Sequence, residues 1–330
     1  MARTKSGCGC AIAVLVVLLG ALGFVGYKFV LPWWNKQPPP ASGKELRVHV
    51  LDVGQGDSIL IVGPEKVVLI DAGDEKSGKK VVEALKQNNI QQIDYFIATH
   101  SHPDHIGGAA EVFNNFKVVT VLHNDFPPPE AVTKNEDVAA AAGKGKKQVK
   151  NQPKAVARQG KVSELPTVKT YNSFISAVES EKAEADTKLE KAEPERMIDL
   201  GGNARLIVLA PVPPLFTKEK IAASRKGNES NANSIVVRLE YGDFSMLLAG
   251  DAEEQTEERL VQKETNLAAT VLKVGHHGSR YATSENFLKR VFRPDDAQSK
   301  AAIISMYEFN RYGHPNQDVL NRLKAAGVKQ

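Results

Sequence analysis

The chain has 330 residues, of which 42% are hydrophobic and 25% are charged, a composition typical of globular proteins that excludes wholesale disorder and a fibrous fold. Its 43 Lys and Arg residues against 39 Asp and Glu residues leave a net charge of only +4, so charge alone does not predict a nucleic-acid-binding protein. The two cysteines, Cys8 and Cys10, lie at the N-terminus, which excludes a disulfide framework, a zinc ribbon and a catalytic cysteine in the body of the chain.

Residues 1–35 combine a short tail with an apolar run. Residues 11–30 carry Lys28 as their only charge, and about 20 apolar residues cross a bilayer as a helix. We therefore expect a single transmembrane anchor that contacts the membrane through residues 11–30. A cleaved signal peptide is the alternative, less favoured because no convincing small-residue cleavage site follows the run. The flanking positive charges do not decide the orientation, and our preference is a single-pass protein with its body outside the cytoplasm.

Residues 36–44 form a proline-rich linker, and residues 45–330 form the body, where apolar runs of strand length alternate with helical patterns. The expected strands are 46–53, 58–62, 67–70, 93–98, 117–122, 204–209, 234–240, 244–249, 270–273 and 301–305. The expected helices are 78–89, 106–115, one that begins at 252, 284–292 and 317–326. Two strand-rich halves with helices outside predict a layered α/β/β/α sandwich.

Between residues 127 and 196 the alternating pattern fails, because Ala, Lys and Glu dominate and no period persists. The stretch 144–161 is basic, and the stretch 179–195 is mostly acidic and compatible with a short solvated helix. We favour a charged, low-complexity insertion that is flexible and buries little. A basic flap that attracts a polyanion is the other interpretation.

A dense cluster of histidines in residues 99–108 gives the strongest functional signal. His100, His102, Asp104 and His105 fall directly after an apolar strand and before a helix. A loop at the carboxyl end of a strand can turn several side chains into one crevice, and imidazole with carboxylate suits zinc, manganese or iron. His100 and His102 can share one metal, while Asp104 and His105 can hold a second.

Four more side chains at strand ends or turns are candidates for the same centre. Asp251 either caps the following helix or binds metal, and we favour the metal because a carboxylate at a strand end faces the histidine loop. Of His276 and His277, one completes a metal shell and the other orients or contacts substrate; we choose His277 as the ligand. His314, in a Tyr-Gly-His-Pro turn, is either a last ligand or a phosphate contact.

Two further segments are expected to support the centre. Asp71, in Ile-Asp-Ala-Gly, is expected to hydrogen-bond a ligand imidazole, as metal-bound histidines usually require. Residues 55–57, Gln-Gly-Asp, are expected to form a tight loop at the rim of the site.

The pattern His100-x-His102-x-Asp104-His105-x-Gly-Gly resembles the hallmark of the metallo-β-lactamase fold. Further segments are similar to the lactamase-type domain of the competence protein ComEC group and, more distantly, to phosphorylcholine esterase: LDVGQGDSIL at 51–60, IDAG at 70–73, LLAGD at 247–251, HHGS at 276–279 and NRYGHP at 310–315. The resemblance covers roughly 46–126 and 196–330. It implies a metallo-β-lactamase-type αββα sandwich, here with an N-terminal transmembrane helix.

The resemblance also implies a metal-dependent hydrolase in which Asp251 bridges two divalent ions, with Zn²⁺ the first choice and Mn²⁺ the second. The preferred reaction is phosphodiester hydrolysis, so we expect a membrane-anchored phosphodiesterase or nuclease acting on DNA or a cell-envelope polymer, with no protein partner. The alternatives are a hydrolase of a lactone, lactam or thioester and a non-catalytic anchored binding module.

In this mechanism Asp104 orients the attacking water and His276 contacts substrate, while Lys273, Ser279 or Arg280 neutralises a phosphate. One departure from the family pattern stands out. Many hydrolases of this fold have a histidine before the strand that leads to Asp251, whereas residues 231–235 read Asn-Ala-Asn-Ser-Ile. The first metal then depends on His277 or His314, or it is weakly held.

Overall fold

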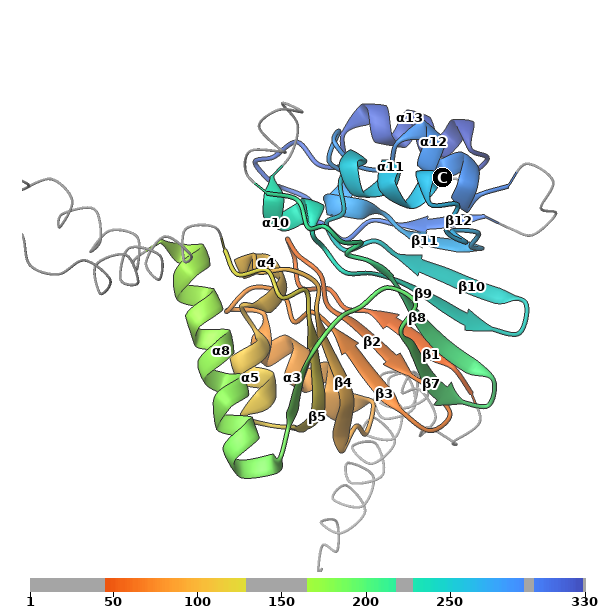
Figure 1. The fold of residues 1–330 in the computed structure, drawn as a ribbon. Coiled ribbons are helices and arrows are strands. Elements are labelled where there is room, and N and C mark those ends of the chain that lie inside the picture. The colour runs from red at the N-terminus through yellow and green to blue at the C-terminus, as the bar shows by residue number, and fades with distance from the viewer. Residues whose placement is uncertain (1–44, 129–164, 218–227, 294–299, 329–330) are drawn as a thin grey trace, which may run out of the picture. The chain divides into compact units, whose positions relative to one another are not determined.

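The computed structural model describes residues 45–128, 165–217, 228–293 and 300–328 (Figure 1). The chain divides into two units, residues 1–40 and 41–330, and the first unit lies outside the described residues. So does the apolar run at 11–30. In the described part of the chain, no helix has both the length and the apolar character needed to cross a membrane. This finding contradicts the expected single-pass membrane location with the body outside the cytoplasm, and that prediction is wrong.

Two six-stranded sheets pack face to face in the described residues (Figure 1). Sheet A contains, in spatial order, β1 (Arg47–Val50), β2 (Ile59–Val62), β3 (Val67–Ile70), β4 (Gln92–Ala98), β5 (Lys117–His123) and β6 (Lys188–Lys191). Sheet B contains, also in spatial order, β12 (Ala301–Ile303), β11 (Val271–Lys273), β10 (Phe244–Leu248), β9 (Val236–Tyr241), β8 (Ala204–Ala210) and β7 (Met197–Gly201).

Each sheet combines an antiparallel half with a parallel half. In sheet A, β1 to β3 pair antiparallel and β3 to β6 pair parallel. In sheet B, β7 to β10 pair antiparallel and β10 to β12 pair parallel. The carboxyl ends of neighbouring parallel strands therefore meet at one edge of each sheet, which is where such sheets place their ligands.

Alternating side chains give each sheet two apolar faces. On β2, Ile59 and Ile61 point into the core between the sheets, whereas Leu60 points to the helices outside sheet A. Leu206 and Val237 of sheet B contribute to the same inter-sheet core. A sheet that is apolar on both faces must be covered on both, and this requirement produces the layered sandwich.

Helices cover the outer face of each sheet. On sheet A these are α3 (Gly78–Gln87), α5 (Ala109–Phe113) and α8 (Pro166–Ala185). On sheet B they are α11 (Glu254–Gln262), α12 (Glu285–Val291) and α13 (Gln317–Ala325). Three short elements complete the described fold: α4 (Pro103–Ile106), α10 (Glu229–Ala232) and the 3₁₀ turn η2 (Gly275–Gly278). The predicted α/β/β/α sandwich is confirmed; the predicted transmembrane helix is not shown.

One predicted helix differs in detail from the structure. The helix expected over 106–115 is divided between α4 and α5 at Gly107 and Gly108. A Cβ on Gly108 would overlap the carbonyl oxygen of Ala72, so the chain can lie this close to the end of β3 only with glycine there. The close approach of the helix to the sheet brings the histidine loop up to the segment that carries Asp71.

The last part of the predicted insertion belongs to the sandwich. Helix α8 buries Phe174 and Val178 in the core outside sheet A, and β6 pairs in parallel with β5. The expectation that 127–196 buries little is thus wrong for 165–196. The apolar stripe of α8 is narrow and lies among Ser, Ala, Lys and Glu, so composition concealed its helical spacing. The basic stretch 144–161 lies outside the described residues.

We expect Phe174→Ala to lower the free energy of unfolding by about 3–5 kcal/mol, because it leaves a cavity beside the rings of Phe96 and Phe113. Urea denaturation of the full chain measures this. Asn172→Ala, exposed on the same helix, is the control and should change stability by less than about 0.5 kcal/mol. Equal stabilities of the two variants would mean that α8 is not part of the core.

Candidate metal centre

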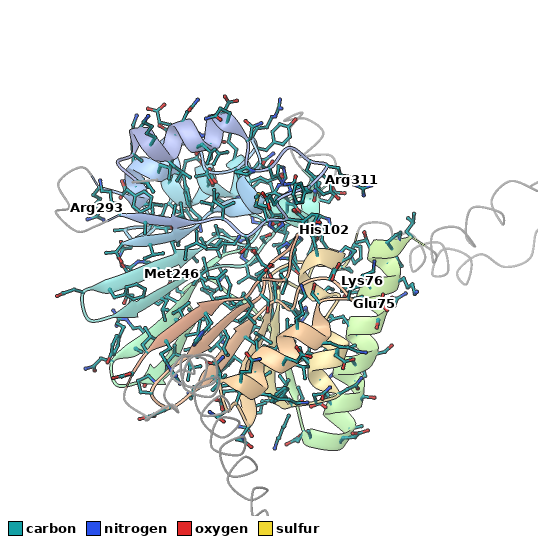
Figure 2. All side chains as sticks on the ribbon, turned by 180° about the vertical axis from the view of Figure 1, so that it is seen from behind. Glu75, Lys76, His102, Met246, Arg293 and Arg311 are labelled. Atoms are coloured by element: carbon teal, nitrogen blue, oxygen red, sulfur yellow. The ribbon has the colours of Figure 1, made fainter. Side chains whose placement is uncertain are left out.

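The predicted site residues converge at the carboxyl ends of parallel strands from both sheets. Asp71 follows β3 and His100 follows β4 in sheet A, while Asp251 follows β10 and His277 lies just after β11 in sheet B. Figure 2 shows His102 at this end of the sandwich, between the two sheets. Segments far apart in sequence thus deliver imidazoles and carboxylates to one place.

Two compact groups of ligand atoms share Asp251. Site 1 consists of His100, His102 and Asp251, and site 2 consists of Asp104, His105 and His277, each with one ligand atom per residue within 4.8 Å of the others. The oxygen Asp251 Oδ1 faces site 2, at 3.3 Å from His105 Nε2 and 3.4 Å from His277 Nε2. The other oxygen, Oδ2, lies 3.8 Å from His100 Nε2. Asp251 therefore stands between the two groups.

Site 2 has the geometry of a cation site. His105 Nε2, His277 Nε2 and Asp251 Oδ1 are buried and have no hydrogen-bond partner among the described residues, although buried polar atoms nearly always have one. Their spacing of 3.3 and 3.4 Å matches that of donors around a tetrahedral zinc ion, which is about 3.3–3.4 Å for bonds of about 2.0–2.1 Å. Asp104 Oδ2 adds a fourth donor 3.4 Å from His277 Nε2. A divalent cation fits this donor set.

Site 1 presents neutral imidazoles. His100 Nε2 lies 2.9 Å from His102 Nδ1, and His100 is 1% exposed. Burial lowers the pKa of His100 well below its usual range, because the charged ring would lose its hydration. A neutral imidazole is the form that binds metal, so His100 needs no deprotonation to act as a ligand.

Opposite charges hold Asp251 and His105 ionised. Burial alone would raise the pKa of Asp251, but His277, His105 and His276 hold it well below its usual range. Burial alone would lower the pKa of His105, but Asp251 and Asp71 raise it well above its usual range. Without a cation, a proton on His105 supplies the positive charge that this pocket of carboxylates requires. A metal ion must displace that proton.

Asp71 fixes the orientation of His105, and the hydrogen bond expected for it is present. Its Oδ2 accepts from His105 Nδ1 at 2.8 Å and from the Thr99 hydroxyl at 2.6 Å, and its Oδ1 accepts from the Thr99 backbone N–H at 2.9 Å. These contacts leave Nε2 as the nitrogen of His105 that faces Asp251. Asp71 has φ of 58°, a left-handed conformation that aspartate tolerates and that turns its side chain toward the site.

The 55–57 loop lies directly against the histidine loop. Asp57 N–H donates to the Asp104 carbonyl at 3.2 Å, and a Cβ on Gly56, whose φ is +126°, would overlap that same oxygen. Only glycine allows this approach. Asp57 Oδ1 is buried and has no hydrogen-bond partner among the described residues, and Asp57, Asp251 and His277 each have a ligand atom within 4.8 Å of the others. From the sequence we expected Asp57 at the rim of the site. Its Gly-Gln-Gly-Asp context was the only local sign that it could lie among the ligands.

Lys273 is not placed as expected. It is completely buried, its Nζ lies 2.7 Å from Asp57 Oδ2, and it also donates to the Val274 carbonyl at 2.9 Å. A buried, paired ammonium cannot reach a phosphate, so direct neutralisation of substrate by Lys273 is wrong. Lys273 instead joins the end of β11 to the 55–57 loop, and its loss would leave Asp57 as an unpaired buried carboxylate.

The two neighbouring histidines of η2 point to different places. His276 and His277 have φ of 44° and 54°, and these consecutive left-handed residues send His277 into site 2 while His276 lies at the rim with its side chain 22% exposed. His276 Nδ1 lies 3.1 Å from Glu253 Oε1, and its Nε2 lies 3.8 Å from Asp251 Oδ2. Sequence reasoning missed Glu253, which follows Asp251 in a run that reads as a helix start.

His314 borders the centre without joining either ligand group. Its ring lies 5.5 Å from that of His276 and 6.5 Å from that of His277. Burial, together with the charges of those two rings, lowers the pKa of His314 to about 4. The described geometry therefore favours a contact at the rim over the expected role as last ligand.

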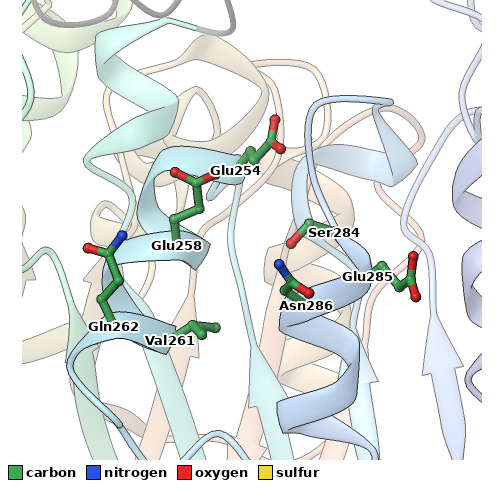
Figure 3. Close-up of a pocket in the computed structure, with 7 residues that line it drawn as sticks. All are labelled: Glu254, Glu258, Val261, Gln262, Ser284, Glu285 and Asn286. Atoms are coloured by element: carbon green, nitrogen blue, oxygen red, sulfur yellow. The ribbon is translucent and has the colours of Figure 1, made fainter.

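A separate surface pocket lies between α11 and α12 (Figure 3). Three of the seven residues that line it carry carboxylates and none is basic: Glu254, Glu258, Val261, Gln262, Ser284, Glu285 and Asn286. An anionic substrate would be repelled there, and no predicted site residue lines it.

Comparisons with known proteins agree with the fold. The model of the metallo-beta-lactamase superfamily matches residues 51–214. The chain is 29% identical to ComE operon protein 3 of Bacillus subtilis over 88% of this chain and 32% of that protein. It is 37% identical to competence protein ComA of Neisseria gonorrhoeae over 32% of this chain and 15% of that protein. The chain thus spans a third or less of these relatives.

Among solved structures, the metallo-beta-lactamase fold protein YhfI from Bacillus subtilis matches with 12% identity and a TM-score of 0.42, over 86% of this chain and 94% of that one.

We expect Zn²⁺ affinity to rise with pH, by up to about tenfold per unit while the pH is below the raised pKa of His105, because the metal displaces its proton. Asp71→Asn, which removes the charge that orients His105, should weaken binding about 10–100-fold and flatten this pH dependence. Competition with a chromophoric chelator at pH 6, 7 and 8 measures both effects.

Glu83→Gln, exposed on α3, is the control and should match the wild type. A wild-type affinity that does not change with pH would contradict a protonated His105 in the empty site.

Proposed function

Because the chain carries a metallo-β-lactamase superfamily domain related to ComEC-group competence proteins, we propose that it is a metal-dependent phosphodiesterase that cleaves DNA or a cell-envelope polymer. The observation that carries the proposal is the convergence of unpartnered, buried His105 Nε2, His277 Nε2 and Asp251 Oδ1. Leaving three such atoms without partners is costly in a folded protein unless a cation joins them.

Two divalent ions would occupy the centre. His100, His102 and Asp251 Oδ2 would hold one, and Asp104, His105, His277 and Asp251 Oδ1 would hold the other. The donors are imidazole nitrogens and carboxylate oxygens, a set without thiolate that suits Zn²⁺ first and Mn²⁺ second. Ions bound in this way supply Lewis acidity toward phosphoryl oxygens and lower the pKa of water to about 7.

Asp104 is the residue of this centre best placed to orient the attacking water. Its side chain is 32% exposed, so one edge faces solvent while Oδ2 faces His277. Burial alone would raise the pKa of Asp104, but His277 and His105 lower it, and the carboxylate stays ionised at neutral pH. It can therefore accept a hydrogen bond from water and orient it for attack.

His276 supplies positive charge at the rim. In the empty centre burial alone would lower its pKa, but Asp251 and Glu253 raise it, and a protonated ring can donate to a phosphate oxygen. Glu253 Oε1 lies 3.1 Å from Nδ1, while Nε2 lies 3.3 Å from Asn231 Nδ2 and 3.8 Å from Asp251 Oδ2. Arg280, two residues beyond η2, is a second cation and is exposed.

We expect Asp104→Asn to lower the rate of bis-p-nitrophenyl phosphate hydrolysis about 100-fold or more, because it removes both a charged metal ligand and the group that orients the attacking water. The wild type should lose activity on treatment with chelator and recover it when Zn²⁺ or Mn²⁺ is added. Asp243→Asn, in the exposed turn between β9 and β10, is the matched control and should keep the wild-type rate.

Full activity of Asp104→Asn, or activity that survives chelation, would refute the metal-dependent mechanism. Parallel assays with a chromogenic lactam, a lactone and a thioester test the substrate class. Faster turnover of any of these than of the phosphodiester would replace the phosphodiesterase proposal, and no turnover with any substrate would leave a binding module.

A further inference from the structure

The loop between β12 and α13 exposes three aromatic rings. Tyr307, Phe309 and Tyr312 are 50%, 76% and 59% exposed, and they make up half of the six large hydrophobic side chains that are exposed in the described residues. Single exposed apolar side chains need no explanation. Three exposed rings in one loop indicate a binding surface.

This aromatic loop, residues 304–316, is continuous with the metal centre. The ring of Tyr312 stacks on that of His314, with centroids 5.7 Å apart and planes at 28°, and His314 in turn borders His276. The backbone N–H of Tyr307 donates to Gln55 Oε1 at 3.3 Å, which ties the loop to the 55–57 segment. A ligand held on the rings would therefore extend into the centre.

The loop is also held in shape before any ligand arrives. The side chain of Asn310 donates to the carbonyls of Tyr307 and His314 at 2.7 and 2.6 Å, and its oxygen accepts from the N–H groups of Tyr312 and His314 at 3.1 and 3.0 Å. Asn316 N–H donates to the Gly278 carbonyl at 2.8 Å, which anchors the loop to η2. The rings are thus presented at little entropic cost to binding.

Cations accompany the rings. Arg311 is exposed with its guanidinium 5.5 Å from the centroid of Tyr312, and Figure 2 shows it at the same end of the sandwich as His102. Arg280 is exposed on the segment that follows η2, and Glu308 is the one acidic residue within the aromatic loop. Flat rings beside guanidinium groups match a ligand that has flat faces and a phosphate backbone.

We propose that Tyr307, Phe309 and Tyr312 form a stacking platform for unpaired nucleobases, so that the centre acts on single-stranded polynucleotides. The proposal rests on the proposed phosphodiesterase function and specifies its substrate. A base stacked on these rings places the adjoining phosphates between the arginines and the histidines at the rim. A duplex hides its base faces and cannot use the platform.

The test measures binding of the full chain to fluorescein-labelled single strands in chelator, which prevents cleavage. A 12-nucleotide oligothymidylate should bind at least about fivefold more tightly than an abasic oligomer of equal length and charge, because stacking contributes at least that much per base. Phe309→Ala with Tyr312→Ala should lower the affinity for oligothymidylate at least about fivefold and leave the weaker, salt-dependent binding of the abasic oligomer unchanged.

Met197→Ala is the control, since Met197 is 58% exposed on β7, at the opposite edge of sheet B from β12. It should keep the wild-type preference for oligothymidylate. Equal binding of the two oligomers by the wild type, or tighter binding of a 12-base-pair duplex, overturns the platform.

Hydrolysis of bis-p-nitrophenyl phosphate separates this proposal from the previous one. The double variant should keep the wild-type rate on this small substrate, and a loss of that rate would show that the rings act on the centre and not on bases. If the wild type hydrolyses no phosphodiester, the proposed function fails, whereas the preference for unpaired bases still stands or falls on the binding data.

Discussion

The architecture depends on one buried carboxylate placed between two sets of imidazoles. Asp251 is 1% exposed and meets His105 and His277 through one oxygen and His100 through the other. A charge so far from water is tolerated only if positive charge surrounds it. A proton on His105 supplies this positive charge in the empty centre, and two divalent cations would supply it in the loaded one. The buried charge of Asp251 therefore determines both the electrostatics of the centre and the ions that it can bind.

Both sheets are needed to build this arrangement. Sheet A supplies the histidine loop after β4, and sheet B supplies Asp251 and η2, and the apolar core between them sets their separation. Close backbone contacts then fix the loops: Gly56 lets the 55–57 segment lie on Asp104, and the buried pair of Asp57 and Lys273 joins that segment to β11. Rigid packing rather than loop flexibility positions the ligands, as site precision requires.

The sequence was informative where chemistry is local and less so where it depends on distant partners. The dense pattern from His100 to His105 predicts a cluster by itself, and the strand ends predict the sandwich. Lys273 was misjudged because its partner Asp57 lies more than 200 residues away, and nothing local shows that its ammonium is buried. The buried face of helix α8 was missed because its sparse apolar stripe is diluted by charged and small residues that dominate the composition.

The most direct test of the centre is the number of metal ions bound to the full chain. After dialysis against excess Zn²⁺ and removal of free metal, elemental analysis should find about two ions per chain in the wild type. Asp251→Ala should bind fewer than about one, while its circular dichroism spectrum shows that it remains folded. A wild type that retains no metal, or a folded Asp251→Ala variant that retains as much as the wild type, would contradict a centre organised around this carboxylate.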